Sequence, residues 1–134
     1  MPRIAILSSR VVCCTLLLVS AACSNPFSGA DCVALGVTGI TATVTDGATN
    51  AAPSSSPELQ LIEGSYEERG TLIVGSRPPV LIAAIERPGT YRVVVRAAGY
   101  RDYVKENTAV RRGGKCNAIQ PVQLDVQLVP SGSM

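Results

Sequence analysis

Short segments in which apolar and polar residues alternate, each bounded by Gly or Pro, constrain the fold of this chain most. The clearest covers Val122–Leu128, where every second residue is aliphatic and the residues between are Gln or Asp. Similar alternation marks Gly36–Thr45, Glu58–Glu63 and Tyr91–Ala97. A period of two with many β-branched residues predicts strands with one buried face. Because turn residues separate these segments at regular spacing, we expect an all-β fold, an antiparallel β-sandwich of roughly six or seven short strands.

Three further segments extend this pattern with less regular sequences. Val80–Ile85 is a continuous apolar run, long enough for a strand and short for a helix. Thr71–Val74 and Asp102–Val110 also favour strands. The stretch Gly64–Pro79 has no clear period overall, so the strand assignment there stays open.

The N-terminal residues have the composition of a targeting segment. Met1–Arg10 carries Arg3 and Arg10 and no acidic residue, and Val11–Ala22 is uncharged and mostly apolar. At about 1.5 Å rise per residue, this run is too short to cross a hydrocarbon core about 30 Å thick. We therefore expect residues 1–22 to be a signal peptide. Its removal leaves equal numbers of basic and acidic residues.

Small residues followed by a cysteine end this segment, in the order Ala21–Ala22–Cys23. The arrangement resembles the bacterial lipobox, although Ser20 stands where Leu is commonest. The resemblance implies that Cys23 is lipidated, that residues 23–36 form a tether, and that the protein is anchored in the bacterial cell envelope. Ser24, rather than Asp, after the cysteine resembles the sorting pattern for the outer membrane. The alternatives are ordinary cleavage that leaves the thiol free, or an uncleaved anchor.

The five cysteines of the chain divide between these regions. Cys13 and Cys14 lie in the expected signal peptide, and Cys23 is the expected lipidation site. Cys32 and Cys116 remain, and an even pair in an exported domain predicts a disulfide. Two free thiols are the alternative. A zinc site is disfavoured because the chain has no His to complete a tetrahedral shell.

Four short motifs occur in an order that is similar to one known family. They are Thr45–Gly47, Arg87–Tyr91 (RPGTY), Ala97–Tyr100 (AAGY) and Val126–Pro130. Together they resemble the carboxypeptidase regulatory-like domain, a prealbumin-like (transthyretin-type) sandwich. The similarity covers residues 37–130 and leaves residues 131–134 as a tail. It implies an accessory or interaction role rather than catalysis.

The second glycine turn of this pattern has a physical explanation. Gly99 is free to adopt a positive φ. Tyr100 is expected to pack its ring over the end of the sandwich and keep its hydroxyl in water.

Composition also excludes several function classes. Without His there is no Ser-His or Cys-His nucleophile pair. Aromatic residues make up 4% and the formal net charge is +2, which disfavours a nucleic-acid surface. We expect no enzyme activity, no cofactor and no metal. The acids Glu58, Glu63, Glu67 and Glu68 are interpreted as a solvated strand edge rather than a glycosidase pair or a cation site.

Two surfaces remain as candidates for binding. The basic residues Arg111, Arg112 and Lys115 are interpreted as a solvated turn, with contact to anionic lipid as the alternative. The apolar run from Val80 to Ile85 is either buried, as a central strand or under the stretch before it, or exposed as a sheet edge that pairs with a partner strand.

In the second case the partner-binding residues are Val80, Leu81, Ile82 and Ile85. The sequence favours a membrane-anchored, non-catalytic envelope lipoprotein that acts as a binding or assembly module. The alternative is a structural, surface-coating lipoprotein with no dedicated ligand.

Overall fold

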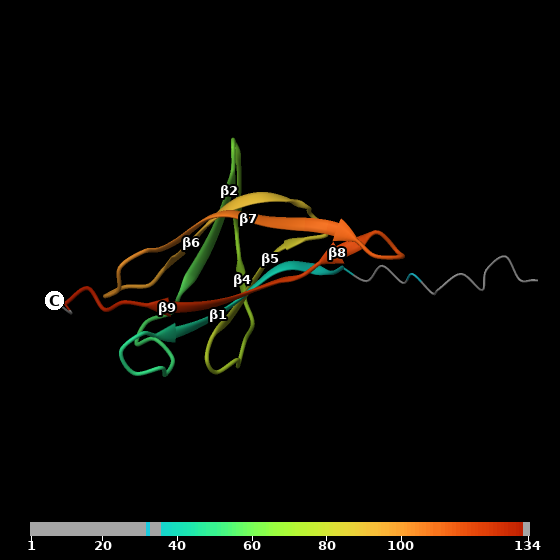
Figure 1. The fold of residues 1–134 in the computed structure, drawn as a ribbon. Coiled ribbons are helices and arrows are strands. Elements are labelled where there is room, and N and C mark those ends of the chain that lie inside the picture. The colour runs from blue at the N-terminus through green and yellow to red at the C-terminus, as the bar shows by residue number, and fades with distance from the viewer. Residues whose placement is uncertain (1–31, 33–35, 133–134) are drawn as a thin grey trace, which may run out of the picture.

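Two β-sheets face each other in the computed structural model, which describes residue 32 and residues 36–132 (Figure 1). The described residues contain no helix. The four-stranded sheet has the order β4 (Thr71–Leu72), β5 (Val80–Ile85), β1 (Thr38–Asp46) and β9 (Val122–Leu128). The five-stranded sheet has the order β3 (Tyr66–Arg69), β2 (Glu58–Glu63), β6 (Gly89–Arg96), β7 (Tyr103–Gly113) and β8 (Ala118–Gln120). The expected all-β sandwich is confirmed.

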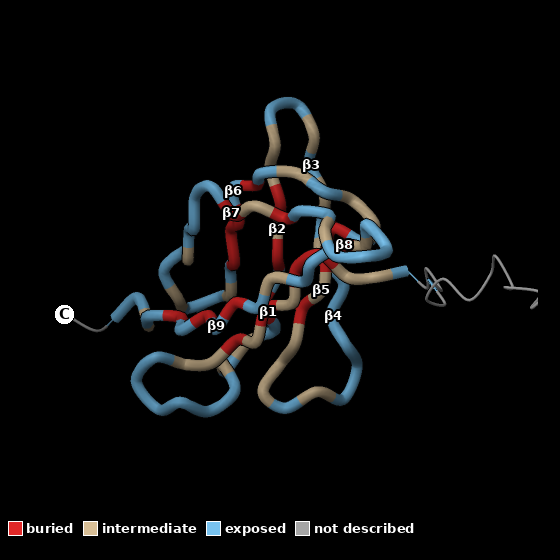
Figure 2. The backbone as a smooth tube through the Cα atoms, turned by 45° about the vertical axis from the view of Figure 1, so that its right-hand side comes forward, coloured by how far each residue is buried: buried red, intermediate tan, exposed pale blue. Residues whose placement is uncertain are grey.

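The apolar faces expected from the alternation are the faces that meet in the core. Ile40, Leu61 and Val126 are fully buried, whereas Gln123 and Asp125 are exposed. Figure 2 shows buried positions alternating with exposed ones along β9. At about 25 cal/mol per Å² of apolar surface removed from water, these facing rows supply the main driving force for folding. The core consists of Ile40, Ala42, Val44, Leu59, Leu61, Leu81, Ala83, Ala84, Tyr91, Val93, Val95, Val110, Ile119, Leu124, Val126 and Leu128.

One pair of neighbouring strands is parallel. β1 lies beside β9 with Ile40 opposite Val122 and Asp46 opposite Leu128. All other paired strands are antiparallel. The expected sandwich is therefore antiparallel except where its first and last strands meet, a pairing between segments far apart in the sequence.

The stretch Gly64–Pro79 crosses from one sheet to the other. β3 pairs with β2, and after Gly70 the chain continues as β4, which pairs with β5. The Gly70 N–H donates to the Leu59 carbonyl oxygen at 2.8 Å. A Cβ on Gly70 would lie 2.7 Å from Leu59 Cδ2, so only glycine permits this close approach. The chain thus closes one side of the sandwich, and β4 is shorter than the strand expected over Thr71–Val74.

The expectation that Val80–Ile85 is an open sheet edge is wrong. β5 lies between β1 and β4, with Ile82 opposite both Thr41 and Thr71. The Ile73 N–H also donates to the Val80 carbonyl oxygen at 2.8 Å. The alternative, in which the preceding stretch covers this strand, is the arrangement observed.

Strand direction gives the sandwich two distinct ends. β5 ends beside the start of β1, where the Val37 N–H donates to a Glu86 carboxylate oxygen at 2.6 Å. We call this the tether end because Cys32 lies at disulfide-bonding distance from Cys116 in the β7–β8 turn. The opposite end, called the far end, carries the loops 47–57, 73–79 and 97–102 (Figure 1).

Candidate functional site

Arg87 lies at the centre of a polar cluster in the β5–β6 turn. Its Nη1 donates to Glu63 Oε1 at 3.0 Å and to the Tyr91 hydroxyl at 2.7 Å. The Tyr91 hydroxyl donates back to the Arg87 carbonyl oxygen at 2.9 Å. The guanidinium carbon lies 3.5 Å from the centroid of the Tyr66 ring, a cation–π contact. These contacts raise the pKa of Arg87, first through the Tyr91 hydroxyl and then through Glu63.

The RPGTY motif owes its residue types to this cluster. Glu63 Oε2 accepts the Thr90 N–H at 2.6 Å, and a Cβ on Gly89 would lie 2.6 Å from the same oxygen. Glycine therefore leaves the space that the carboxylate occupies. The Thr90 N–H, followed by Arg87, lowers the pKa of Glu63. The motif holds a turn in place.

Two more of the acidic residues, Glu67 and Glu68, are also engaged in hydrogen bonds. Glu68 accepts the Tyr66 hydroxyl at 2.9 Å and the Ala84 N–H at 3.0 Å. The hydrogen bond to Glu68 is the main reason that the pKa of Tyr66 is raised. Glu67 accepts an N–H from the Gln60 side chain at 3.2 Å. Glu63 and Glu68 are thus structural acceptors rather than purely solvated side chains.

Tyr100 ties together the loops of the far end. Its hydroxyl donates to Asp46 Oδ2 at 2.8 Å and accepts the Ser54 N–H at 3.1 Å. The other Asp46 oxygen accepts the N–H groups of Ala48 and Thr49 at 2.7 and 3.1 Å. Gly99 has the expected positive φ, +85°. The Tyr100 hydroxyl therefore has a role that the sequence did not predict, because it fixes the 47–57 loop.

These two clusters predict acid sensitivity. The Tyr100 hydroxyl and the Ala48 N–H lower the pKa of Asp46 from its ordinary value of 3.8, and the pKa of Glu63 is lowered from 4.5. Each carboxyl thus binds a proton more weakly in the folded than in the unfolded chain. The stability that these two carboxylates contribute is therefore fully present above the ordinary pKa values. It is lost as the pH drops through the lower pKa values of the folded chain.

Urea unfolding at a series of acidic pH values checks this sign. The Asp46→Asn, Glu63→Gln double variant should show a flatter dependence on pH than the wild type. Asp125→Asn, at an exposed acid on β9, is the matched control. If the free energy of unfolding of the double variant fell with pH as steeply as that of the wild type, the assignment of the acid sensitivity to Asp46 and Glu63 would be wrong.

The basic residues of the β7–β8 hairpin are Arg111 and Arg112, which lie at the end of β7 and pair with β8, and Lys115 in the turn. We call this hairpin end the basic β7–β8 turn, and it divides into a bound and an unbound part. Arg112 donates to the Glu86 carbonyl oxygen at 2.9 Å and lies 3.5 Å from the Glu86 carboxylate. Arg111 and Lys115 are exposed and have no ion pair or side-chain hydrogen bond within residues 36–132. Cys116 follows directly, with its Cα 5.5 Å from that of Cys32. Arg111 and Lys115 are therefore accessible at the surface, next to the cysteine that lies at disulfide-bonding distance from Cys32.

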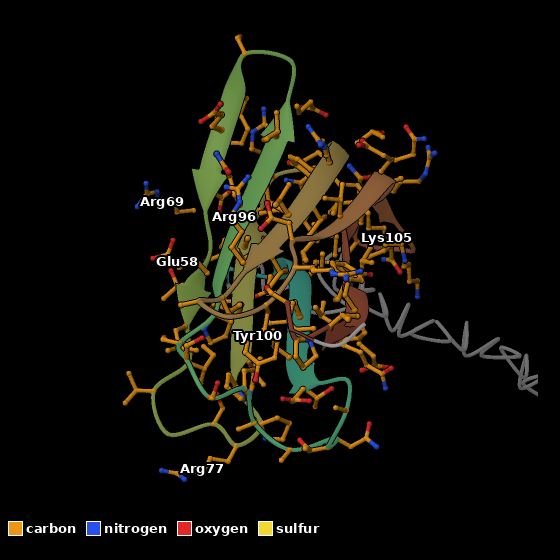
Figure 3. The ribbon with its side chains drawn as sticks, turned by 90° about the vertical axis from the view of Figure 1, so that its left-hand side faces the viewer. Glu58, Arg69, Arg77, Arg96, Tyr100 and Lys105 are labelled. Carbon is orange, nitrogen blue, oxygen red and sulfur yellow. A yellow bond between two sulfur atoms is a disulfide. The ribbon has the colours of Figure 1, made fainter. Side chains whose placement is uncertain are left out.

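An exposed apolar tip lies at the far end, in the connection from β4 to β5. Leu72 and Ile73 are 39% and 40% exposed, and Val74 is 95% exposed. Arg77, in the same loop, projects from the edge of the molecule in Figure 3 and has no ion pair with any described residue. Neighbouring exposed aliphatic side chains of this kind are typical of a contact site. We call Leu72, Ile73 and Val74 the apolar tip.

A groove adjoins the apolar tip. One hollow of about 240 Å³ lies where the chain changes sheet, and a second of about 150 Å³ lies next to it. Glu58, Leu59 and Arg69 line both hollows. Figure 3 shows Glu58, Arg69 and Arg96 on one face of the molecule. The first hollow is lined by Ser56, Pro57, Glu58, Leu59, Arg69, Gly70, Leu72 and Leu81.

The predicted site residues have separate locations. Cys23 lies outside the described residues. Leu81 is buried, Val80 and Ile82 are half-buried, and Ile85 is 51% exposed at the tether end. They do not form one accessible edge.

The apolar tip is the feature that sequence reasoning missed. Its signal was an aliphatic run that continues to Val74, directly before the turn residue Gly75. The run predicts a strand over Thr71–Val74, whereas β4 ends at Leu72 and only the Ile73 N–H bonds to β5 beyond it.

No protein-family model matches this chain, and no curated protein matches it. The described part of the chain has no helix that is long and apolar enough to span a membrane. Within the same residues, no three Cys, Asp or Glu side chains are grouped to hold a metal ion.

Proposed function

We propose that this protein is a lipid-anchored, non-catalytic lipoprotein of the bacterial cell envelope whose sandwich acts as a binding or assembly module. The basic start, the short apolar run and the small residues before Cys23 support the anchor. Several acyl chains on one cysteine stabilise membrane attachment nearly irreversibly, since each buried CH₂ contributes about 0.8 kcal/mol. Ser24 favours the outer membrane as the destination.

The observation that carries the binding role is the position of the apolar tip. It lies at the far end, separated by the length of β5 from the end at which Cys32 meets Cys116. In a protein held through Cys23, this tip points away from the attachment point and is accessible to a partner. The adjoining groove, with Arg69 and Glu58 on its walls, adds charged groups that orient such a partner.

The resemblance to the carboxypeptidase regulatory-like domain is consistent with a module that works by contact. Its two most specific motifs, RPGTY and AAGY, hold turns through Arg87 and Tyr100. A scaffold with fixed turns presents its loops in one geometry, which lowers the entropy lost on binding.

The anchor is tested with Cys23→Ala. We expect the wild type to incorporate labelled palmitate and to sediment with membranes, and the variant to lose both properties. Cys14→Ala is the matched control and should retain them, because this residue is expected to leave with the signal peptide. Mass spectrometry of the mature N-terminus measures the lipid directly. An unchanged mass and unchanged sedimentation in Cys23→Ala would overturn the anchor.

The binding role is tested by charge substitution in crosslinked envelopes. Val74→Asp should abolish recovery of a partner that the wild type captures, because the charge stays hydrated at the contact. Val104→Asp, at a valine 42% exposed on β7, is the matched control and should retain the partner. If Val74→Asp captures the same partner as the wild type, the apolar tip is not the contact site; if the wild type captures nothing, the surface-coating alternative is favoured.

A further inference from the structure

We infer that the basic β7–β8 turn docks onto anionic phosphate groups of the membrane leaflet that holds the lipid anchor. The inference rests on the proposed anchoring through Cys23. It assigns a binding surface at the tether end, distinct from the apolar tip at the far end. The residues that contact the phosphate groups are Arg111 and Lys115.

The first argument is distance. Cys32 follows Cys23 by nine residues. An extended chain covers at most about 3.6 Å per residue, so the pair with Cys116 holds this turn within roughly 32 Å of the anchor. A short tether also keeps the local concentration of the turn at the leaflet high. The β7–β8 turn is thus the part of the sandwich with the shortest covalent path to the membrane.

The second argument is unbalanced charge. Residues 107–124 contain Arg111, Arg112 and Lys115 and no acidic residue. Glu86 is the acid that contacts the turn, and its carboxylate also accepts the Val37 N–H. It faces Arg112, so the charges of Arg111 and Lys115 stay uncompensated by any described residue.

The third argument is shape. An open hollow of about 460 Å³ lies beside the turn. It is lined by Pro88, Gly89, Thr90, Val110, Arg111 and Arg112. Arg112 is held in place by its bonds to Glu86, whereas Arg111 is free to reach a phosphate oxygen with a bidentate guanidinium. The wall of the hollow therefore combines a fixed cation and a movable one.

The expected strength follows from the number of free cations. A basic residue near an anionic surface strengthens binding about fivefold, so two contribute about 25-fold at low salt. This attraction is screened at high salt. Docking at this end also directs the apolar tip away from the bilayer.

The test uses the processed full-length protein reconstituted into phosphatidylcholine vesicles with and without phosphatidylglycerol. Amide hydrogen exchange of residues 111–117 is measured on both. We expect slower exchange on the anionic vesicles at low salt and equal exchange at high salt. The Arg111→Gln, Lys115→Gln double variant should lose this difference. The Arg77→Gln, Arg101→Gln double variant removes two exposed arginines of the far end and should retain it.

Equal amide hydrogen exchange of residues 111–117 on the two vesicle types would overturn docking. Slower exchange of residues 73–79 instead of residues 111–117 would overturn it as well. Flotation with neutral vesicles at high salt reports the anchor separately. If the protein fails to float there, the proposed anchoring is wrong. Its affinity for anionic vesicles at low salt then decides docking: a loss of about 25-fold in the first double variant supports it, and equal affinity overturns it.

Discussion

Replacing Tyr91 with alanine should lower the free energy of unfolding by about 3–5 kcal/mol, the range for removing a large aromatic side chain from a core. Tyr91 is fully buried and is the largest side chain in the core. Its ring fills the space between the sheets below the β5–β6 turn. Its hydroxyl also accepts from Arg87 Nη1 and donates to the Arg87 carbonyl oxygen. Urea unfolding followed by circular dichroism measures the change.

Tyr91→Phe separates the two contributions. This variant keeps the ring and loses both hydrogen bonds, so we expect a decrease of about 1–2 kcal/mol. A loss as large as that in Tyr91→Ala would place the main contribution in the polar cluster. No loss in Tyr91→Ala would contradict the packing described for the core.

Reducing the Cys32–Cys116 pair should lower the free energy of unfolding by about 2–4 kcal/mol. The two cysteines are 84 residues apart in the sequence, so a crosslink between them restricts most of the unfolded chain. The strands and the core lie within residues 36–132 and do not include Cys32. Reduction should therefore leave the folded circular dichroism spectrum unchanged while moving the urea midpoint to lower concentration.

The Cys32→Ser, Cys116→Ser double variant is the control for the reductant. It should unfold at the midpoint of the reduced wild type and show no further shift when reductant is added. Alkylation of the unfolded, unreduced protein gives an independent readout, since bonded cysteines do not react. Reaction of both thiols without reduction would contradict the disulfide.

Local periodicity was sufficient to predict the faces of the strands. The rule that every second residue points inward correctly placed Ile40, Leu59 and Val126 in the core. The rule applies because a sandwich buries one face of each sheet. Whether a side chain faces the core therefore follows from its position along its own strand. The turn motifs around Gly89 and Gly99 were predicted for the same reason, since each depends on a few neighbouring residues.

Features that depend on distant contacts were not predictable in this way. Gly70 marks the crossing between sheets because Leu59, on another strand, leaves no room for a Cβ. The pairing that covers Val80–Ile82 likewise depends on where the preceding loop folds back. The exposure of Val74 follows from the length of β4, which the aliphatic run overstates. The candidate contact surface was therefore assigned to the wrong segment.

The parallel pairing of β1 with β9 has a consequence for the timing of folding. β1 is an inner strand only after β9, which follows it by more than seventy residues, pairs with it and places Ile40 opposite Val122. A nascent or partly translocated chain that lacks Val122–Leu128 thus leaves β1 with one edge unpaired and the core without Leu124 and Val126. On the proposed export route, the four-stranded sheet is therefore complete only once Val122–Leu128 has crossed the membrane.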